Sequence, residues 1–130
     1  MSQEFKVEIV NPDQAFFSSE KATEVVVPAF EGDMGILKDH ISIISFLKPG
    51  IIKISISNEE EKFYVDDGII EFKDNQLSVL TSSIFNLKNV DKNILEKNLK
   101  EAEKQLKEEE LSDQNRFLIS QKVDVLKSIN

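Results

Sequence analysis

Few side chains in this chain have the types and spacing that chemistry requires. Glu31 and Asp33 lie in the glycine-flanked run Glu31-Gly32-Asp33-Met34-Gly35, and two carboxylates can serve as general acid and general base. They lack a catalytic partner, however, and the flanking glycines predict an exposed loop. An ordinary surface loop or a docking loop therefore explains them better than catalysis, because loops on a rigid scaffold often carry recognition.

His40 is the only histidine, and a lone histidine is more often a hydrogen-bonded structural residue than a base or a pH switch. The chain has no cysteine, which excludes disulfides, thiolate metal sites and cysteine nucleophiles, and one histidine cannot form a zinc site of the usual kind. No serine-nucleophile motif or glycine-rich phosphate-binding motif is present. The sequence therefore predicts neither a cofactor nor a reaction centre.

The other acidic runs have simpler explanations. Glu59-Glu60-Glu61 is expected at a solvated hairpin tip, and Asp66-Asp67 precedes a glycine in a predicted turn. The formal net charge of −8 disfavours binding to nucleic acid or to an anionic membrane surface. No apolar run approaches the roughly 20 residues of a transmembrane helix, and the N-terminus lacks the features of a targeting peptide. We expect a protein that stays in the compartment where it is made, without direct insertion into lipid.

The elements that position these residues change character near residue 88. Before it, short β-rich runs and turn signals recur every 8–12 residues or so, which is typical of a sandwich or barrel. Ile52, Ile54 and Ile56 alternate with polar residues, and Thr23 to Val27 is predicted to be a strand that ends at Pro28.

Turn residues separate the predicted strands. Lys48-Pro49-Gly50 has Pro and Gly where a type II turn needs them, and Asp66-Asp67-Gly68 suits a hairpin because Asp-Gly tolerates positive φ. Asn11-Pro12-Asp13 and Asp74-Asn75 are predicted to be further turns.

The chain after residue 88 has no Gly or Pro and is rich in helix formers. Asp91 is predicted to cap a first helix, with Asn93 and Glu96 as an alternative capping box. Ser112 or Asp113 is predicted to cap a second helix. The apolar stripe of the first helix consists of Leu95, Leu99, Ala102 and Leu106. The predicted fold class is α+β and mainly β: an antiparallel β-sandwich docking domain over residues 1–88, then a two-helix antiparallel hairpin over residues 89–130.

The second predicted helix has an apolar face that is too wide for a hairpin alone. A two-helix hairpin buries one stripe per helix, so the sandwich or another protein must cover the rest. The hairpin is also small, so we expect an element of marginal local stability that can detach. The apolar residues of this helix are Phe117, Leu118, Ile119, Val123, Val125, Leu126 and Ile129.

The stretch from Val25 to His40 resembles the signature of the ATP synthase epsilon family, in which a strand is followed by Glu-Gly-(Glu/Asp)-x-Gly-x-x-x-x-His. The continuation of this stretch closes in Leu47-Lys48-Pro49-Gly50, as the family's does. Two later blocks, Phe63 to Glu71 and Leu77 to Thr81, resemble the family in the expected order. The resemblance covers residues 4 to about 110 well and the last helix in type only.

This resemblance implies a non-catalytic rotor subunit in the central stalk of an F-type ATP synthase, peripheral at the cytoplasmic face of the bacterial inner membrane. It implies that the sandwich docks on the gamma subunit and on polar loops of the membrane c-ring, so that proton transport stays coupled to ATP synthesis. It also implies that the hairpin can fold against the sandwich or extend to the catalytic alpha and beta subunits and inhibit ATP hydrolysis. The docking residues to which it points are Glu31, Gly32, Asp33, Met34 and His40.

The sequence departs from the family pattern at the helices. Family members that bind ATP carry Ile/Leu-Asp-x-x-Arg-Ala, whereas this chain keeps Asp91 but has Ile94 in place of the arginine, so a guanidinium for phosphate is missing. Of the family's nucleotide-binding motif, this chain therefore retains Asp91. The family's inhibitory contacts use basic residues of the last helix, which here are Arg116, Lys122 and Lys127, with Asp124 among them.

Two other classes of function remain open on the sequence alone. One is a small β-sandwich module that binds carbohydrate or peptide and dimerises through a helical tail. Such a module needs an aromatic-lined groove, and the chain has no Trp and one Tyr. The other is a hydrolase, which the lack of a nucleophile–base pair disfavours.

Overall fold

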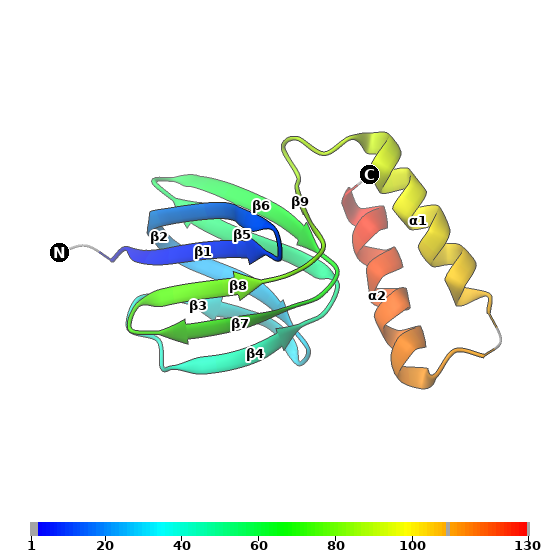
Figure 1. Ribbon diagram of the computed structural model, residues 1–130, viewed down its shortest axis with the longest axis horizontal. Helices are drawn as coiled ribbons and strands as arrows, with labels where there is room; N and C mark the ends of the chain where they lie inside the picture. The colour runs from blue at the N-terminus through cyan, green and yellow to red at the C-terminus, as the bar shows by residue number, and fades with distance from the viewer. Residues whose placement is uncertain (1–2, 109, 130) are drawn as a thin grey trace.

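The computed structural model describes residues 3–108 and 110–129, in which nine strands are followed by two helices (Figure 1). The predicted fold class, a mainly β fold with a sandwich followed by two helices, is confirmed. The elements are β1 (Phe5–Asn11), β2 (Gln14–Ala29), β3 (Gly32–Ile36), β4 (Ile43–Leu47), β5 (Gly50–Ile56), β6 (Glu59–Val65), β7 (Gly68–Lys73), β8 (Gln76–Leu80), β9 (Ile84–Asn86), α1 (Lys92–Leu106) and α2 (Asp113–Ile129).

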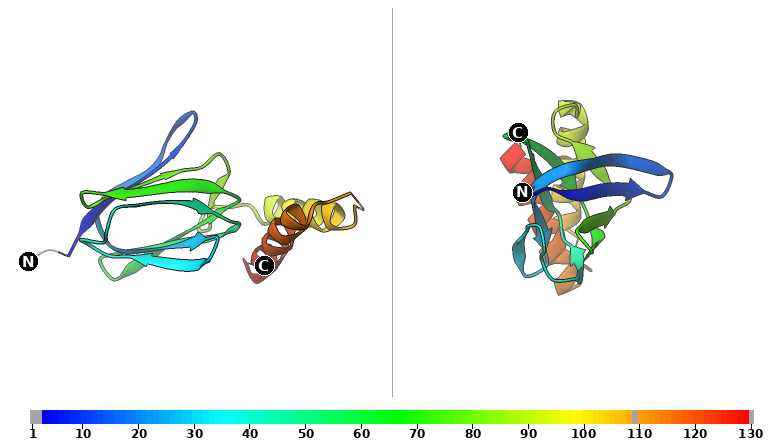
Figure 2. Two further views of the ribbon diagram at one scale, coloured as in Figure 1. Left: turned by 90° about the horizontal axis from the view of Figure 1, so that it is seen from below. Right: turned by 90° about the vertical axis from the view of Figure 1, so that its left-hand side faces the viewer.

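Strand β2 belongs to both layers of the sandwich because it is 16 residues long. Its first half pairs with β1, and its second half pairs with β3 on one side and β5 on the other. One layer therefore contains β3, β2, β5, β6 and β9, and the other contains β2, β1, β8, β7 and β4. Among the described strands the pairings are antiparallel except for β1 and β8, which run parallel and so depart from the purely antiparallel prediction. Figure 2 shows the sandwich from two further sides, with the helices at one end.

The core fills the space between the two layers with side chains from alternate strand positions. The alternation predicted for β1 and β5 is seen in their burial, and Phe5 contacts Phe72 edge to face with 5.7 Å between ring centroids. The fully enclosed members of this cluster all come from the stretch between Phe5 and Val79. The sandwich therefore has a core to which neither helix contributes a buried side chain.

Two of the predicted turn types are wrong, for physical reasons that the structure shows. Gly50 does not adopt a positive φ, so Lys48-Pro49-Gly50 is not the predicted type II turn. A glycine is needed there because a Cβ atom at this position would lie 2.4 Å from Pro28 Cβ. Asp66-Asp67-Gly68 is not a hairpin either, since β6 pairs with β5 and β9 whereas β7 pairs with β4 and β8. This segment instead crosses from one layer to the other.

Other two-residue segments do form hairpin turns, among them the predicted turn at Asp74-Asn75. Ser57 and Asn58 join β5 to β6, and Asp74 and Asn75 join β7 to β8. All four residues have positive φ, between 47° and 66°, as a type I′ turn requires. The strand predicted for Thr23 to Val27 extends to Ala29, and Pro28 is tolerated because the pairing between β2 and β5 has already ended at Val26.

The two helices begin at predicted caps. Asp91 Oδ1 accepts the backbone N–H of Asn93 at 2.8 Å, so Asp91 caps α1. Ser112 Oγ accepts the backbone N–H of Asn115 at 3.1 Å, so Ser112, not Asp113, caps α2. The hairpin packs at the end of the sandwich that is opposite the N-terminus (Figure 1).

A second apolar cluster joins the hairpin to the sandwich. Tyr64 of β6 lies at its centre with Leu95 of α1 and Leu126 of α2, and Val125 and Ile129 pack against it. The sandwich thus covers the C-terminal part of the wide apolar face of α2. The N-terminal part stays open, and the side chain of Phe117 is 46% exposed.

We predict that Gly50→Ala lowers the free energy of unfolding by about 1–3 kcal/mol, because the new methyl group would overlap Pro28. Gly35→Ala is the matched control, since its Cβ atom would lie 3.6 Å from Glu24 Oε2, an ordinary contact. Urea denaturation of the two variants measures the difference. Equal stability of both variants would contradict the close approach at Gly50.

Candidate docking surfaces

The loop predicted to carry docking residues is the tight hairpin between β2 and β3. Ala29 pairs with Gly32, so Phe30 and Glu31 form the turn. Gly32 has a φ of 132°, a conformation that L side chains rarely adopt, and this explains the glycine between the two acidic residues. Glu31 and Asp33 are exposed.

The other residues predicted for this loop, Asp33 and Met34, lie in strand β3, which gives the turn a fixed position. Met34 is half-buried and packs against the sandwich core. Asp33 lines a small cavity of ≈ 240 Å³ together with Gln121 and Val125 of α2. The loop therefore presents two fixed carboxylates at the hairpin end of the sandwich, where they can bind cationic groups of a partner.

His40 does not belong to this loop in space. Strand β3 separates it from Glu31, and a strand rises about 3.3 Å per residue. His40 Nδ1 lies 2.7 Å from the backbone oxygen of Ile41, and its ring meets Phe72 edge to face at 5.8 Å. The structure thus gives His40 packing and hydrogen-bonding contacts at the end of the sandwich away from the helices, and does not bring it to the four loop residues.

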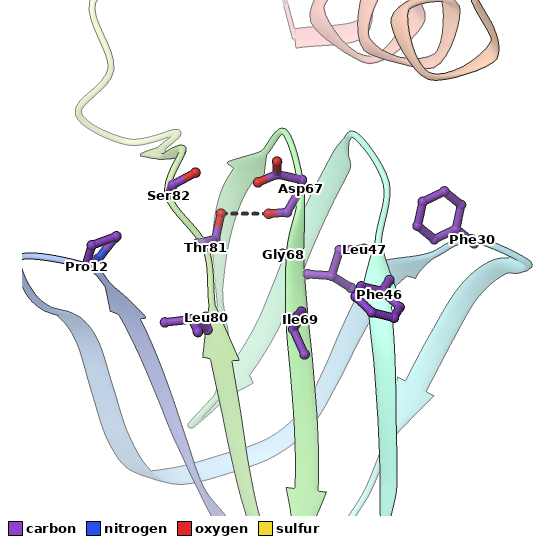
Figure 3. Close-up of a pocket in the computed structure, with 10 residues that line it drawn as sticks. All are labelled: Pro12, Phe30, Phe46, Leu47, Asp67, Gly68, Ile69, Leu80, Thr81 and Ser82. Atoms are coloured by element: carbon purple, nitrogen blue, oxygen red, sulfur yellow. Dashed lines mark hydrogen bonds between the residues drawn. The ribbon is translucent and has the colours of Figure 1, made fainter. Parts of the chain in front are cut away.

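A row of exposed apolar side chains crosses the outer face of β4, β7 and β8. Phe46 lies opposite Ile69, and Ile69 lies opposite Leu80, so the three side chains are neighbours across adjacent strands (Figure 3). Phe46 is 60% exposed and Leu80 is 53% exposed. We call these three residues the outer apolar row. Exposed apolar side chains that form a contiguous patch mark an interaction site.

A groove of ≈ 610 Å³ runs along this row toward the hairpin end of the sandwich. Phe30 and Pro12 border it, and Asp67, Gly68 and Thr81 lie at the end nearer the helices (Figure 3). Thr81 Oγ1 donates a hydrogen bond of 2.6 Å to the backbone oxygen of Asp67. This bond joins the segment between β8 and β9 to the segment between β6 and β7. The groove is therefore built on a braced part of the fold.

The outer apolar row was not predicted from the sequence, although the sequence contains a signal for it. Strands with one wet face alternate apolar and polar residues, whereas strands covered on both faces are apolar throughout. Ile43-Ile44-Ser45-Phe46-Leu47 and the pair Ile69-Ile70 carry apolar side chains on both faces. Such runs in an antiparallel sandwich indicate a second covering partner.

Asp66 is the centre of a polar network at the junction of sandwich and hairpin. Its Oδ1 atom accepts a hydrogen bond of 2.6 Å from the Tyr64 hydroxyl, and its Oδ2 atom accepts one of 2.7 Å from Ser83 Oγ. Lys122 Nζ of α2 lies 3.2 Å from Oδ1. Burial, and then the hydrogen bond to Asp66 and its charge, raise the pKa of Tyr64 well above its ordinary value, so the hydroxyl stays a donor.

The basic residues predicted to make inhibitory contacts have different surroundings. The Arg116 guanidinium donates to the backbone oxygens of Leu106 and Glu108 at 3.0 and 3.3 Å and so caps the end of α1. Lys122 pairs with Asp66. Lys127 is exposed in the last turn of α2. In this arrangement two of the three side chains are engaged within the chain.

Asp91 has a structural role, since its carboxylate is used as the helix cap described above. Across residues 3–108 and 110–129, no three side chains of the metal-binding types His, Asp and Glu gather as a metal site would require. Nor does any helix in these ranges have the length and apolar character needed to cross a bilayer.

Known proteins of one family resemble this chain. Residues 4–87 match the family model described as the ATP synthase delta/epsilon chain, β-sandwich domain. The chain is 63% identical over 130 residues to the ATP synthase epsilon chain of Pelagibacter ubique (strain HTCC1062), with 100% of both chains covered. It is 39% identical over 108 residues to the ATP synthase epsilon chain of Dichelobacter nodosus (strain VCS1703A), with 82% of this chain and 75% of that one covered.

Two solved structures share the fold. One is a chain in the cryo-EM structure of Euglena gracilis mitochondrial ATP synthase, OSCP/F1/c-ring in rotational state 1, with a TM-score of 0.73 and 19% identity over 98% of this chain and 79% of that chain. The other is a chain in the Tetrahymena thermophila mitochondrial ATP synthase central stalk/c-ring, with a TM-score of 0.63 and 14% identity over 98% of this chain and 96% of that chain. The match over residues 4–87 and the 63% identity over the full length show that the chain belongs to the delta/epsilon family of ATP synthase subunits, in which it is a non-catalytic rotor subunit.

Proposed function

We propose that this rotor subunit binds the gamma subunit through the outer apolar row and the c-ring through the loop of Glu31, Gly32, Asp33 and Met34. The observation that carries the proposal is the row itself, because Phe46, Ile69 and Leu80 form a fixed apolar surface that nothing in the chain covers among the described residues. Covering such a surface removes apolar area from water and stabilises a complex by about 25 cal/mol per Å² of gross transfer free energy.

Gamma is the partner proposed for the row because the resemblance to the epsilon family implies that the sandwich docks on gamma. The family membership supports partners within ATP synthase, and the two structural neighbours come from assemblies named for F1, the c-ring and the central stalk. A rigid apolar groove beside Phe30 suits a preformed protein surface, since neither partner then has to become ordered on binding.

The c-ring is the partner proposed for the docking loop. Glu31 and Asp33 are exposed carboxylates on a turn that Gly32 and Met34 hold in place. Such charges pair with basic groups of polar ring loops and set the register of the contact more than its affinity. The subunit would then lie peripherally at the cytoplasmic face of a bacterial inner membrane.

We propose that residues 1–88 form the docking domain and that residues 89–130 form a regulatory hairpin. The sandwich has its own core, and the hairpin is joined to it by a smaller second cluster. Lys122 is engaged by Asp66 of the sandwich, so it can reach the alpha and beta subunits only after the hairpin leaves the sandwich. Arg116 is engaged by Leu106 and Glu108 within the hairpin, so it is freed only when the two helices also separate. Inhibition of ATP hydrolysis would therefore require the extended arrangement.

We predict that Phe46→Asp weakens binding to gamma about tenfold or more, because it places a charge at the centre of an apolar contact. Ile41→Asp is the control, since Ile41 is 77% exposed and lies at the far end of the sandwich. Calorimetric titration of purified gamma with each full-length variant measures the affinities. Unchanged binding of gamma by Phe46→Asp would show that the outer apolar row is not part of the interface.

We predict that Glu31→Ala combined with Asp33→Ala weakens the coupling of ATP hydrolysis to proton pumping without changing the melting temperature, because both carboxylates are exposed. Two exposed ion pairs contribute about 0.4–2 kcal/mol to a contact. Glu20→Ala with Glu59→Ala, two exposed carboxylates elsewhere on the sandwich, is the charge-matched control. ATP-driven proton pumping in membrane vesicles is the measurement, and normal pumping by the loop variant would contradict the role of the loop.

We predict that a chain ending at residue 88 stays folded and still binds gamma, because the sandwich core includes none of the hairpin residues that the structure describes. Removing the hairpin should also release any restraint on ATP hydrolysis by the assembled enzyme. Circular dichroism, gamma binding and ATPase assays test the three statements separately. An unfolded fragment would refute the division into two domains, and unchanged hydrolysis would refute the regulatory role.

A further inference from the structure

The contact between hairpin and sandwich is small and mostly apolar. Among the buried residues of the second cluster, the sandwich contributes Tyr64, and the helices contribute Leu95 and Leu126. Lys48 Nζ lies over the Phe117 ring at 6.0 Å from its centroid, which is a weak contact at this distance. Apolar packing of this kind has little directional preference, so it does not by itself fix how α2 lies on the sandwich.

The directional contact is the pair formed by Asp66 and Lys122. The Asp66 and Lys122 side chains are 26% and 25% exposed, so solvent screens this pair less than it screens an ordinary surface ion pair. Within the described parts of the chain it is the one ion pair that joins the sandwich to the hairpin. Lys122 lies near the middle of α2, so an ion pair at this residue restrains the position of the whole helix.

The Asp66 carboxylate is held in place before Lys122 arrives. Tyr64 and Ser83 each donate a hydrogen bond to it, one to each oxygen, and both belong to the sandwich side of the junction. The backbone N–H of Asp66 also donates to the Ser83 oxygen at 3.3 Å. A carboxylate that is already oriented loses little side-chain entropy when it forms an ion pair, which strengthens the pair.

We propose that Asp66 is the residue that holds the hairpin on the sandwich, and that release of the hairpin requires Lys122 to exchange Asp66 for another carboxylate or for water. One ammonium group cannot occupy the Asp66 site and contact an acidic segment of another subunit at the same time. The fraction of folded hairpin therefore depends on this pair. What the hairpin does after release rests on the proposed function, whereas its attachment is a property of the isolated subunit.

The test uses the full-length isolated subunit, whose sequence contains no cysteine and so accepts spin labels at chosen sites. Labels at Glu20→Cys and Lys107→Cys, both exposed, report the distance between sandwich and hairpin by pulsed electron resonance. We expect one narrow distance for the parent chain. Asp66→Asn and Lys122→Gln should each increase the undocked population about fivefold, and the double variant should not exceed the single variants.

Two further variants serve as controls. Asp67→Asn and Lys127→Gln remove exposed charges next to Asp66 and on α2, and they should leave the distance distribution unchanged. One molar salt should broaden the distribution of the parent but not that of Lys122→Gln, because salt screens only the charge pair. Lys122 lies outside the sandwich, so Lys122→Gln tests the proposal even if Asp66→Asn disturbs folding.

A distribution for Lys122→Gln that matches the parent at low salt would overturn the proposal, as would an equal effect of Lys127→Gln. Gamma binding, measured separately by calorimetry, reports on the proposed function. If Asp66→Asn and Lys122→Gln bind gamma normally but keep their hairpins docked, only the role of Asp66 is refuted. Failure of the parent chain to bind gamma would refute only the proposed binding of the sandwich to gamma.

Discussion

Each side chain of a strand points to one face of its sheet or the other, and β4, β7 and β8 carry large apolar side chains on both faces. The inner faces form the core of the sandwich with the opposite layer. Within residues 3–108 and 110–129 no second layer covers the outer faces, so Phe46, Ile69 and Leu80 remain exposed. A rotor subunit that transmits force without chemistry needs a rigid surface of this kind, and a braced sheet provides it more reliably than a loop would.

The hairpin end of the sandwich combines two roles in one short segment. Asp66 faces α2 through Lys122, whereas Asp67 and Gly68, the next two residues, line the outer groove. The crossing from β6 to β7 is therefore shared by the surface proposed for gamma and by the attachment of the hairpin. Gly68 has little freedom to change, because a Cβ atom there would lie 2.9 Å from the Leu80 carbonyl oxygen. The shape of the outer groove is thus fixed together with the shape of the site where the hairpin attaches.

Much of the fold could be predicted from the sequence because its signals are local. Alternation identified β1 and β5, and cap residues identified the starts of both helices. The long strand β2 was only partly predicted, because its two halves lie in different layers and its first half lacks the β-branched run of the second.

The errors came from contacts that are remote in sequence. The glycine at position 50 is set by Pro28, which lies 22 positions earlier in the chain, and not by turn geometry. The role of Asp66 depends on Tyr64, Ser83 and Lys122, which no spacing rule connects, so its neighbour Gly68 suggested a hairpin instead. His40 was placed beside the docking loop by the family resemblance, and strand β3 puts it at the other end of the sandwich from that loop.

Methyl NMR of the full-length subunit, recorded in the presence of a soluble paramagnetic agent with and without purified gamma, tests whether gamma covers the outer apolar row. In the free subunit the methyl groups of Ile44, Ile69 and Leu80 should be broadened by the agent, because these side chains are exposed. Binding of gamma to the row predicts that these three signals become protected when gamma is added, while the methyl signals of Ile41, at the far end of the sandwich, stay broadened. Protection of Ile41 with continued broadening of Ile69 and Leu80 would contradict it.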